Sequence, residues 1–179
     1  MNKSSSPGVV CVRVSPLDRR RGHLRYGPLH MHAALGESGI TVFKQEGDGA
    51  TPFGRMKVLS GFRNGRLRIF APSQVKLFRT TDRHGWCDAP AHACYNQPVR
   101  LPFGASHEQL LRDDCLYDFA LVLDYNISSR KRSSGSAIFF HVAKPGYPPT
   151  RGCIAISRRD MIRLLPHLRP GTTIVVRGG

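Results

Sequence analysis

The stretch Tyr117-Asp-Phe-Ala-Leu-Val-Leu-Asp-Tyr125 (YDFALVLDY) is the most apolar run in this chain of 179 residues. Five consecutive apolar residues at its centre, between polar neighbours, are typical of a strand that is buried on both faces. We therefore expect residues 117–125 to form a buried central strand. A second run of this kind, residues 137–142 (AIFFHV), predicts another buried strand that ends at His141.

Shorter segments with strand character surround these two runs, separated by Gly, Pro and polar residues that favour turns. The expected strands are residues 9–14, 23–32, 40–44, 56–60, 66–70, 77–79 and 172–176. One helix is predicted near the C-terminus, because Ser157 and Asp160 have capping-box spacing and apolar residues follow at helical intervals up to Gly171. Residues 106–112 predict one or two further helical turns, with Ser106 as the N-cap.

Length and composition indicate one folded domain. The apolar content of 40% argues against wholesale disorder, and 13 Pro with 18 Gly are more than a helical bundle tolerates. We expect a mostly β single domain over residues 9–179, a β-sandwich or barrel with one or two short helices. Residues 1–8 are short and polar, and we expect them to be disordered.

The net charge is the unusual property of the chain. Lys and Arg number 27 and Asp and Glu 12, which gives +15 at pH 7. Such a charge points to an anionic partner, either nucleic acid or a polymer that bears carboxylates or phosphates. The basic residues are scattered and match no recognised nucleic-acid motif, so we expect no nucleic acid as partner. No run of eighteen apolar residues predicts a transmembrane segment, and no signal peptide is visible.

Five cysteines leave at least one thiol unpaired. Cys87 and Cys94 are close enough in sequence for a disulfide, and the sequence leaves open whether they form one. A zinc site is not expected, because the chain has no CxxC pair. His30 and His32 alternate on one strand face but lack a nearby third ligand. We therefore expect no metal and no cofactor.

The residues with the clearest catalytic character are His141 and the sequence Thr150-Arg-Gly-Cys153. A Cys that follows Gly in a tight turn suits a nucleophile, since the Gly lets the backbone approach a reacting carbonyl. We expect His141 to accept the thiol proton and to hold Cys153 as a thiolate with a lowered pKa. The N–H groups of Gly152 and Cys153 would face the oxyanion. The same residues also fit a structural Cys beside a His at the edge of the core.

The ordered combination of residues 47–55 (GDGATPFGR), His141 and residues 150–153 resembles the L,D-transpeptidase catalytic domain, also called the YkuD domain. That family has a Thr-Pro-x-Gly turn, then a His, then a Ser/Thr-His-Gly-Cys turn. The resemblance covers residues 40–157. It implies the β-sandwich-like L,D-transpeptidase fold, peptidoglycan stem peptides as donor and acceptor, and a location in the periplasm.

The resemblance also implies a role for each matching residue. Cys153 is the nucleophile, His141 the general base, and the carbonyl of Val142 or a near neighbour orients the imidazole. The sulfur attacks the carbonyl at the L-centre of diaminopimelate in a donor tetrapeptide and expels the terminal D-Ala. An amine of a second stem then resolves the thioester.

The chain departs from the family pattern at three points. Arg151 replaces the His of the family turn, and we expect this cation to hold a substrate carboxylate. Ala155 stands where the family often has Asn or Arg, and only eleven residues separate His141 from Cys153. This shorter pattern is similar to a compact branch from alpha- and betaproteobacteria, associated with cross-links between L-Ala(1) and diaminopimelate(3).

The segment 85–98 is expected to be irregular and to form a pocket wall against the substrate. The expected substrate-binding residues are Arg151, Thr150, Trp86, Asp88, Tyr95, Asn96 and Arg100. Trp86 and Tyr95 fit equally well as core residues that anchor this segment. Two other classes of function remain open. One is an L,D-carboxypeptidase or L,D-endopeptidase that uses the same acyl-enzyme, and the other is a basic nucleic-acid- or cell-wall-binding module without catalysis. We expect a monomer.

Overall fold

The computed structural model describes residues 8–69 and 71–179. The expected disordered segment 1–8 lies outside the described residues, except for Gly8. The carbonyl of Gly8 accepts a hydrogen bond from Thr173 N at 3.1 Å, which joins this residue to the last strand of the domain.

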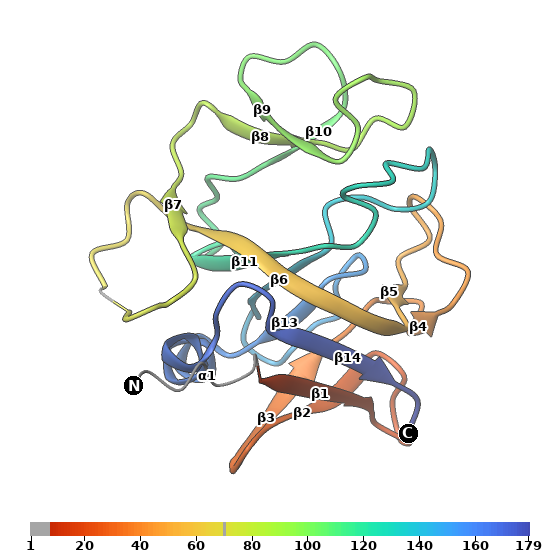
Figure 1. The fold of residues 1–179 in the computed structure, drawn as a ribbon, viewed down its shortest axis with the longest axis vertical. Helices are drawn as coiled ribbons and strands as arrows, with labels where there is room; N and C mark the ends of the chain where they lie inside the picture. Colours follow the sequence, from red (N-terminus) through yellow and green to blue (C-terminus); the bar gives the residue numbers. More distant parts are fainter. Residues whose placement is uncertain (1–7, 70) are drawn as a thin grey trace, which may run out of the picture.

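The described residues form a large β-sheet that closes on itself (Figure 1). The strand order is β11-β12-β13-β3-β2-β1-β14-β6, and β6 pairs with β11 as well as with β14, which completes the ring. A further strand, β7, pairs with β6. Closure gives each strand of the ring a partner on both sides. The bounds are β1 (Val9–Val14), β2 (Arg21–Tyr26), β3 (Leu29–Ala34), β6 (Gly54–Arg63), β7 (Leu77–Arg79), β11 (Phe119–Leu123), β12 (Phe139–Val142), β13 (Ile154–Ile156) and β14 (Thr173–Arg177).

Strand β11 is buried on both faces, as the sequence predicted. Phe119, Leu121 and Leu123 belong to the core cluster inside the barrel. Ala120 and Val122, which alternate with them, belong to a second cluster on the outer face. This two-sided burial explains why the run is continuously apolar instead of alternating.

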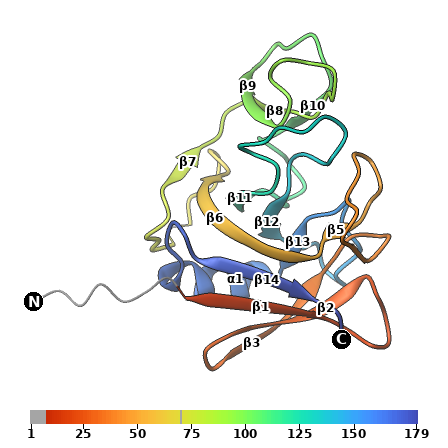
Figure 2. The same ribbon diagram turned by 45° about the vertical axis from the view of Figure 1, so that its right-hand side comes forward.

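A small three-stranded sheet covers this outer face. Its strands are β8 (His84–Cys87), β9 (Gln97–Arg100) and β10 (His107–Gln109), in the order β10-β8-β9. Trp86 of β8 packs in the outer cluster with Phe62 and Phe139. Figures 1 and 2 show the small sheet at the opposite end of the molecule from β1, β2 and β3. The side chains of the outer cluster therefore form the layer between the barrel wall and the small sheet. Strands β4 (Ile40–Thr41) and β5 (Thr51–Pro52) form a separate two-stranded parallel sheet.

The helix lies at the predicted place and is shorter than predicted. It comprises α1 (Arg158–Leu164) and a 3-10 turn η1 (Leu165–His167). Ser157 caps it by accepting a hydrogen bond from Asp160 N at 3.0 Å. Pro166 cannot donate to the α-helical ladder, which explains the tighter last turn. Neither α1 nor any other helix of residues 8–69 and 71–179 has the length and apolarity needed to cross a bilayer.

Five local predictions differ from the structure. The single strand expected over residues 23–32 is a hairpin, in which β2 and β3 pair in antiparallel fashion around a turn at residues 27–28. Residues 106–112 contain β10 instead of helical turns, because pairing with β8 outweighs the weak helical signal. Residues 66–69 form no strand; Arg66 N donates to the Asn64 side chain (2.9 Å) and the chain turns there. Residue 70 lies outside the described residues. In segment 40–44 the strand ends at Thr41, and the segment 85–98 contains parts of β8 and β9.

Candidate functional site

Cys153 lies directly before β13, on the outer face of the barrel wall. Parallel pairing sets Phe140 beside Ile154 and His141 beside Ala155. The sulfur of Cys153 donates to Ala137 O at 3.2 Å and accepts from Phe139 N at 3.3 Å. The thiol is therefore fixed at the beginning of β12, half-buried between the wall and the outer cluster.

The turn before Cys153 requires glycine. Gly152 has φ +120°, and a Cβ at this position would lie 2.8 Å from Ala50 O. The N–H of Gly152 donates to Thr150 Oγ1 at 3.2 Å, so this donor, which the sequence assigned to the oxyanion, is already engaged. No described residue accepts the N–H of Cys153. Cys153 N–H is therefore open to an oxyanion.

Two threonine hydroxyls hold the carbonyl of Cys153. Thr150 Oγ1 donates to it at 2.7 Å and Thr51 Oγ1 at 3.2 Å. Thr51 is fully buried and accepts from Gly36 N at 2.8 Å. The Thr-Pro-x-Gly turn is thus joined directly to the cysteine turn. Thr150, expected to bind substrate, uses its hydroxyl within the protein.

His141 lies two residues after Phe139 on β12, so both side chains are on the outer face. The imidazole is 4% exposed. Its Nδ1 lies 2.8 Å from Val142 O, the contact that the family resemblance implies. With Nδ1–H donating to this carbonyl, Nε2 is left as the acceptor nitrogen. The sulfur and the imidazole thus share one face of the same strand pair.

Burial disfavours the charged forms of both groups. It raises the pKa of the Cys153 thiol to about 12, against the smaller effect of the Phe139 N–H. It also lowers the pKa of His141 to about 4, despite the bond to the Val142 carbonyl. The sequence predicted a lowered pKa for the Cys153 thiol; burial raises it instead, because desolvation disfavours the charged form.

Three polar residues beside these groups were not predicted. The Tyr117 ring packs edge-on against His141 at 5.3 Å and Phe139 at 5.8 Å, and its hydroxyl donates to Glu108 Oε1 at 3.3 Å. Arg112 Nη1 donates to the same oxygen at 2.7 Å. Because residues 106–112 were predicted to be helical, the sequence did not place Glu108 and Arg112 beside the site. The position of Tyr117 at the start of the most apolar run was the available signal.

Trp86 and Asn96 are interior residues, which overturns their predicted contact with substrate. Trp86 packs edge-on against Phe139 at 5.2 Å and donates from Nε1 to Asn96 Oδ1 at 3.0 Å. Asn96 is buried, and its amide nitrogen donates to Tyr125 O (3.1 Å) and Asn126 O (2.9 Å). Its Oδ1 also accepts from Ala137 N at 3.0 Å. Asn96 therefore connects three segments behind the sulfur.

The remaining predicted substrate-binding residues differ in their exposure to solvent. Tyr95 is buried and donates to Glu46, so it too is a core residue. Asp88 is half-buried, and its Oδ1 has no partner among the described residues. Arg100 and Arg151 are exposed to solvent.

Cys87 and Cys94 form no disulfide in this structure. Cys87 and Cys94 are both free thiols, Cys87 buried and Cys94 half-buried. The open question of a disulfide between them is therefore answered for this structure.

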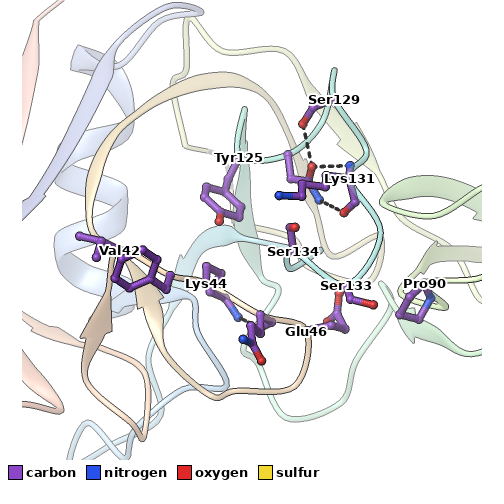
Figure 3. A pocket seen from close by; sticks show the side chains of 12 residues that line it. Val42, Lys44, Glu46, Pro90, Tyr125, Ser129, Lys131, Ser133 and Ser134 are labelled. Carbon is purple, nitrogen blue, oxygen red and sulfur yellow. Dashed lines mark hydrogen bonds between the residues drawn. The ribbon is translucent and has the colours of Figure 1, made fainter.

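A groove of about 890 Å³, lined by the side chains drawn in Figure 3, adjoins Gly152 of the cysteine turn through Lys44. Lys44 connects the two: its Cε lies 3.6 Å from where a Gly152 Cβ would be, and its Nζ donates to Asp48 at 2.5 Å and Gln45 O at 2.7 Å. The groove is lined by Val42, Phe43, Lys44, Gln45, Glu46, Pro90, Tyr125, Asn126, Ser129, Lys131, Ser133 and Ser134. The Lys44 side chain is only 3% exposed and is paired with Asp48, so the groove offers mainly its serine hydroxyls and Lys131.

The chain matches solved structures from several bacteria, including the following three. Bd1075 of Bdellovibrio bacteriovorus is 15% identical over 99% of this chain and 50% of that chain, with a TM-score of 0.47. L,D-transpeptidase 1 of Mycobacterium tuberculosis is 12% identical over 96% and 63% (TM-score 0.40). An L,D-transpeptidase of Xylanimonas cellulosilytica is 16% identical over 98% and 63% (TM-score 0.43). This chain therefore spans between half and two thirds of their length.

No curated protein matches the sequence. The family model of the L,D-transpeptidase catalytic domain, YkuD, matches residues 12–176, which is nearly the whole chain. The match includes Thr51, His141 and the cysteine turn. This chain belongs to the YkuD family of L,D-transpeptidase catalytic domains.

Proposed function

We propose that this domain cross-links peptidoglycan stem peptides through a thioester on Cys153. The observation that supports the proposal most strongly is the position of the Cys153 sulfur beside β12, on the face that also bears His141. The turn around the sulfur is fixed by two threonine hydroxyls and a glycine. Such a rigid turn is what a nucleophile needs to meet a carbonyl at a defined angle.

The first half-reaction starts from a neutral Cys153 thiol and a neutral His141 imidazole. Nε2 of His141 takes the thiol proton while the sulfur attacks the carbonyl at the L-centre of diaminopimelate. The C–S bond forms, the C–N bond to D-Ala breaks, and the departing amine takes the proton from the imidazolium. Cys153 N–H donates to the oxyanion. Gly152 N–H joins it only if its weak bond to Thr150 is exchanged.

In the second half-reaction, an amine of another stem takes the acyl group. The compact family branch favours L-Ala(1) as the acceptor, which gives an L-Ala(1)–diaminopimelate(3) cross-link. The exposed Arg151 suits a substrate carboxylate, and the net charge of +15 suits a carboxylate-rich wall. A peptidoglycan substrate implies action in the periplasm.

A hydrolase is the second candidate. Transfer of the same thioester to water would make the domain an L,D-carboxypeptidase or L,D-endopeptidase. The partition between amine and water depends on how well water is excluded from the thioester. Cys153 is half-buried and retains access to solvent, so water can reach the thioester; this observation favours hydrolysis as the second candidate.

Incubation with purified tetrapeptide muropeptides and mass analysis of the products tests the proposal. We expect dimers and free D-Ala, with both lost in Cys153→Ala and reduced at least a hundredfold in His141→Ala. Cys115→Ala is the matched control, because this exposed cysteine lies outside the site. Shortened monomers without dimers would favour the hydrolase. Full turnover by Cys153→Ala would refute both.

A further inference from the structure

We propose that Glu108 binds the ammonium group of the acceptor and takes its proton in the second half-reaction. This inference rests on the proposed function, since it assigns the acceptor site of the same thioester. Neither the family motifs nor the sequence predictions include Glu108. The placement and bonding of its carboxylate lead to the proposal.

Glu108 lies at the edge of the cluster that covers the sulfur. In the small sheet, β10 pairs with β8 and sets Glu108 opposite Trp86. The Trp86 ring packs on Phe139 at 5.2 Å, and Phe139 N donates to Cys153 Sγ at 3.3 Å. The half-buried Cys153 packs against this same cluster. The carboxylate and the thiol therefore border one layer, between the barrel wall and the small sheet.

The carboxylate is anchored by one oxygen. Oε1 accepts from Arg112 Nη1 (2.7 Å) and from the Tyr117 hydroxyl (3.3 Å). No donor among the described residues reaches Oε2, and the Glu108 side chain is 31% exposed. Arg112 is itself bonded to both oxygens of Asp114, so its charge is shared between two carboxylates. Oε2 is thus held in place and open to a cation that arrives from solvent.

The charge of Glu108 acts on the sulfur. After burial and the Phe139 N–H, the negative charge of Glu108 is the next contribution to the pKa of Cys153, which it raises. It acts in the same direction on the pKa of Tyr117, after burial and the Cys153 charge. An ionised Glu108 therefore opposes a thiolate, and a protonated Glu108 no longer does. The thiolate is the group that leaves when an amine attacks the thioester.

Proton transfer to Glu108 would both activate the acceptor amine and remove the charge that opposes the thiolate. The acceptor ammonium gives one proton to Glu108, and the neutral amine attacks the thioester carbonyl. The C–N bond forms, the C–S bond breaks, and the second amine proton passes through His141 to the sulfur. The products are the amide cross-link and the neutral thiol, and Glu108 releases its proton to solvent. The charge that opposes the thiolate is absent while the sulfur leaves.

The test separates the two half-reactions of the purified domain. Glu108→Gln keeps the shape and the bonds to Oε1 while it removes the charge. Acyl-enzyme formation from a donor tetrapeptide, measured by intact mass and D-Ala release, should stay equal or rise, because the charge that opposes the thiolate is removed. Dimer formation at pH 7 should fall at least tenfold, with a higher KM for the acceptor. Asp113→Asn is the matched control, because this exposed carboxylate pairs with Arg66 away from the sulfur.

The pH dependence distinguishes a proton acceptor from a structural residue. An α-amine has a pKa near 8 and needs no base above it. The defect of Glu108→Gln should therefore shrink severalfold between pH 7 and pH 9, and Glu108→Asp should recover part of the activity at pH 7. Equal losses in acylation and dimer formation, or a defect that is constant with pH, would overturn the inference. Acylation that persists in Cys153→Ala would instead refute the proposed function.

Discussion

The Thr51 hydroxyl donates a hydrogen bond to the main-chain carbonyl of Cys153 at 3.2 Å, across 102 positions of the sequence. Thr51 belongs to the Thr-Pro-x-Gly turn, and Cys153 is the nucleophile that we propose. Thr51 also accepts from Gly36 N at 2.8 Å. The threonine thus joins the β4–β5 region to the cysteine turn from a fully buried position. The two motifs of the family are parts of one local structure.

Replacement of Thr51 by Val should test this connection. The change keeps the shape but leaves the buried Gly36 N–H without its acceptor and removes a donor from the Cys153 carbonyl. We expect a loss of about 1–3 kcal/mol in the free energy of unfolding, measured in urea, and at least tenfold lower turnover. Thr51→Ser, which retains the hydroxyl, should restore most of both. A Val variant with the turnover of the wild type would contradict a positioning role.

Gly152→Ala should be far more harmful than another glycine replacement with positive φ. A Cβ on Gly152 would lie 2.8 Å from Ala50 O, whereas a Cβ on Gly146 (φ +79°) would meet nothing within 4 Å. Gly146→Ala should cost about 1 kcal/mol from backbone strain alone and retain turnover. Gly152→Ala should lower thermal stability further and abolish dimer formation. Equal effects of the two variants would show that the close approach of Ala50 is unimportant.

Asn96→Ala should loosen the segment behind the sulfur. Asn96 makes four hydrogen bonds from a buried position, one of them with the single tryptophan of the chain, Trp86. We expect a loss of at least about 3 kcal/mol in unfolding free energy and a red-shifted Trp86 emission. Asn96→Asp keeps the Oδ1 contacts but not the amide donors. Its unfolding free energy should therefore lie between those of the wild type and Asn96→Ala. Unchanged emission in Asn96→Ala would contradict this assignment.

His141 should make the fold sensitive to acid. Its folded pKa is about 4, below the ordinary value of 6.5, so the unfolded chain binds a proton between these values that the folded chain does not. The unfolding free energy should therefore fall by about 3 kcal/mol from this group as the pH drops from 6.5 to 4. Urea unfolding of His141→Gln should lack that part of the decrease. Parallel pH profiles for the two proteins would contradict a buried neutral imidazole.

The sequence was informative where burial is two-sided or where a motif is contiguous. The continuous apolar run at β11 predicted a central strand because both of its faces are buried. The capping pair Ser157 and Asp160 located the helix start because capping is a local interaction. The Gly152–Cys153 turn could be recognised for the same reason.

Features that depend on long-range packing escaped prediction. Residues 107–109 form a strand only because β8 lies beside them, and Glu108 approaches the site only through that pairing. Asn96 and Trp86 have polar groups that suit a substrate, yet those groups bond to each other inside the protein. The pKa of Cys153 depends on burial, which the residue types of the motif do not encode.

The most direct test is intact-mass measurement of the domain after exposure to a donor tetrapeptide muropeptide, followed by peptide mapping. We predict a mass increase equal to the donor minus D-Ala, located on Cys153 alone and absent from Cys153→Ala. An adduct on another cysteine, or dimers formed with no adduct on Cys153 at any time, would contradict the account.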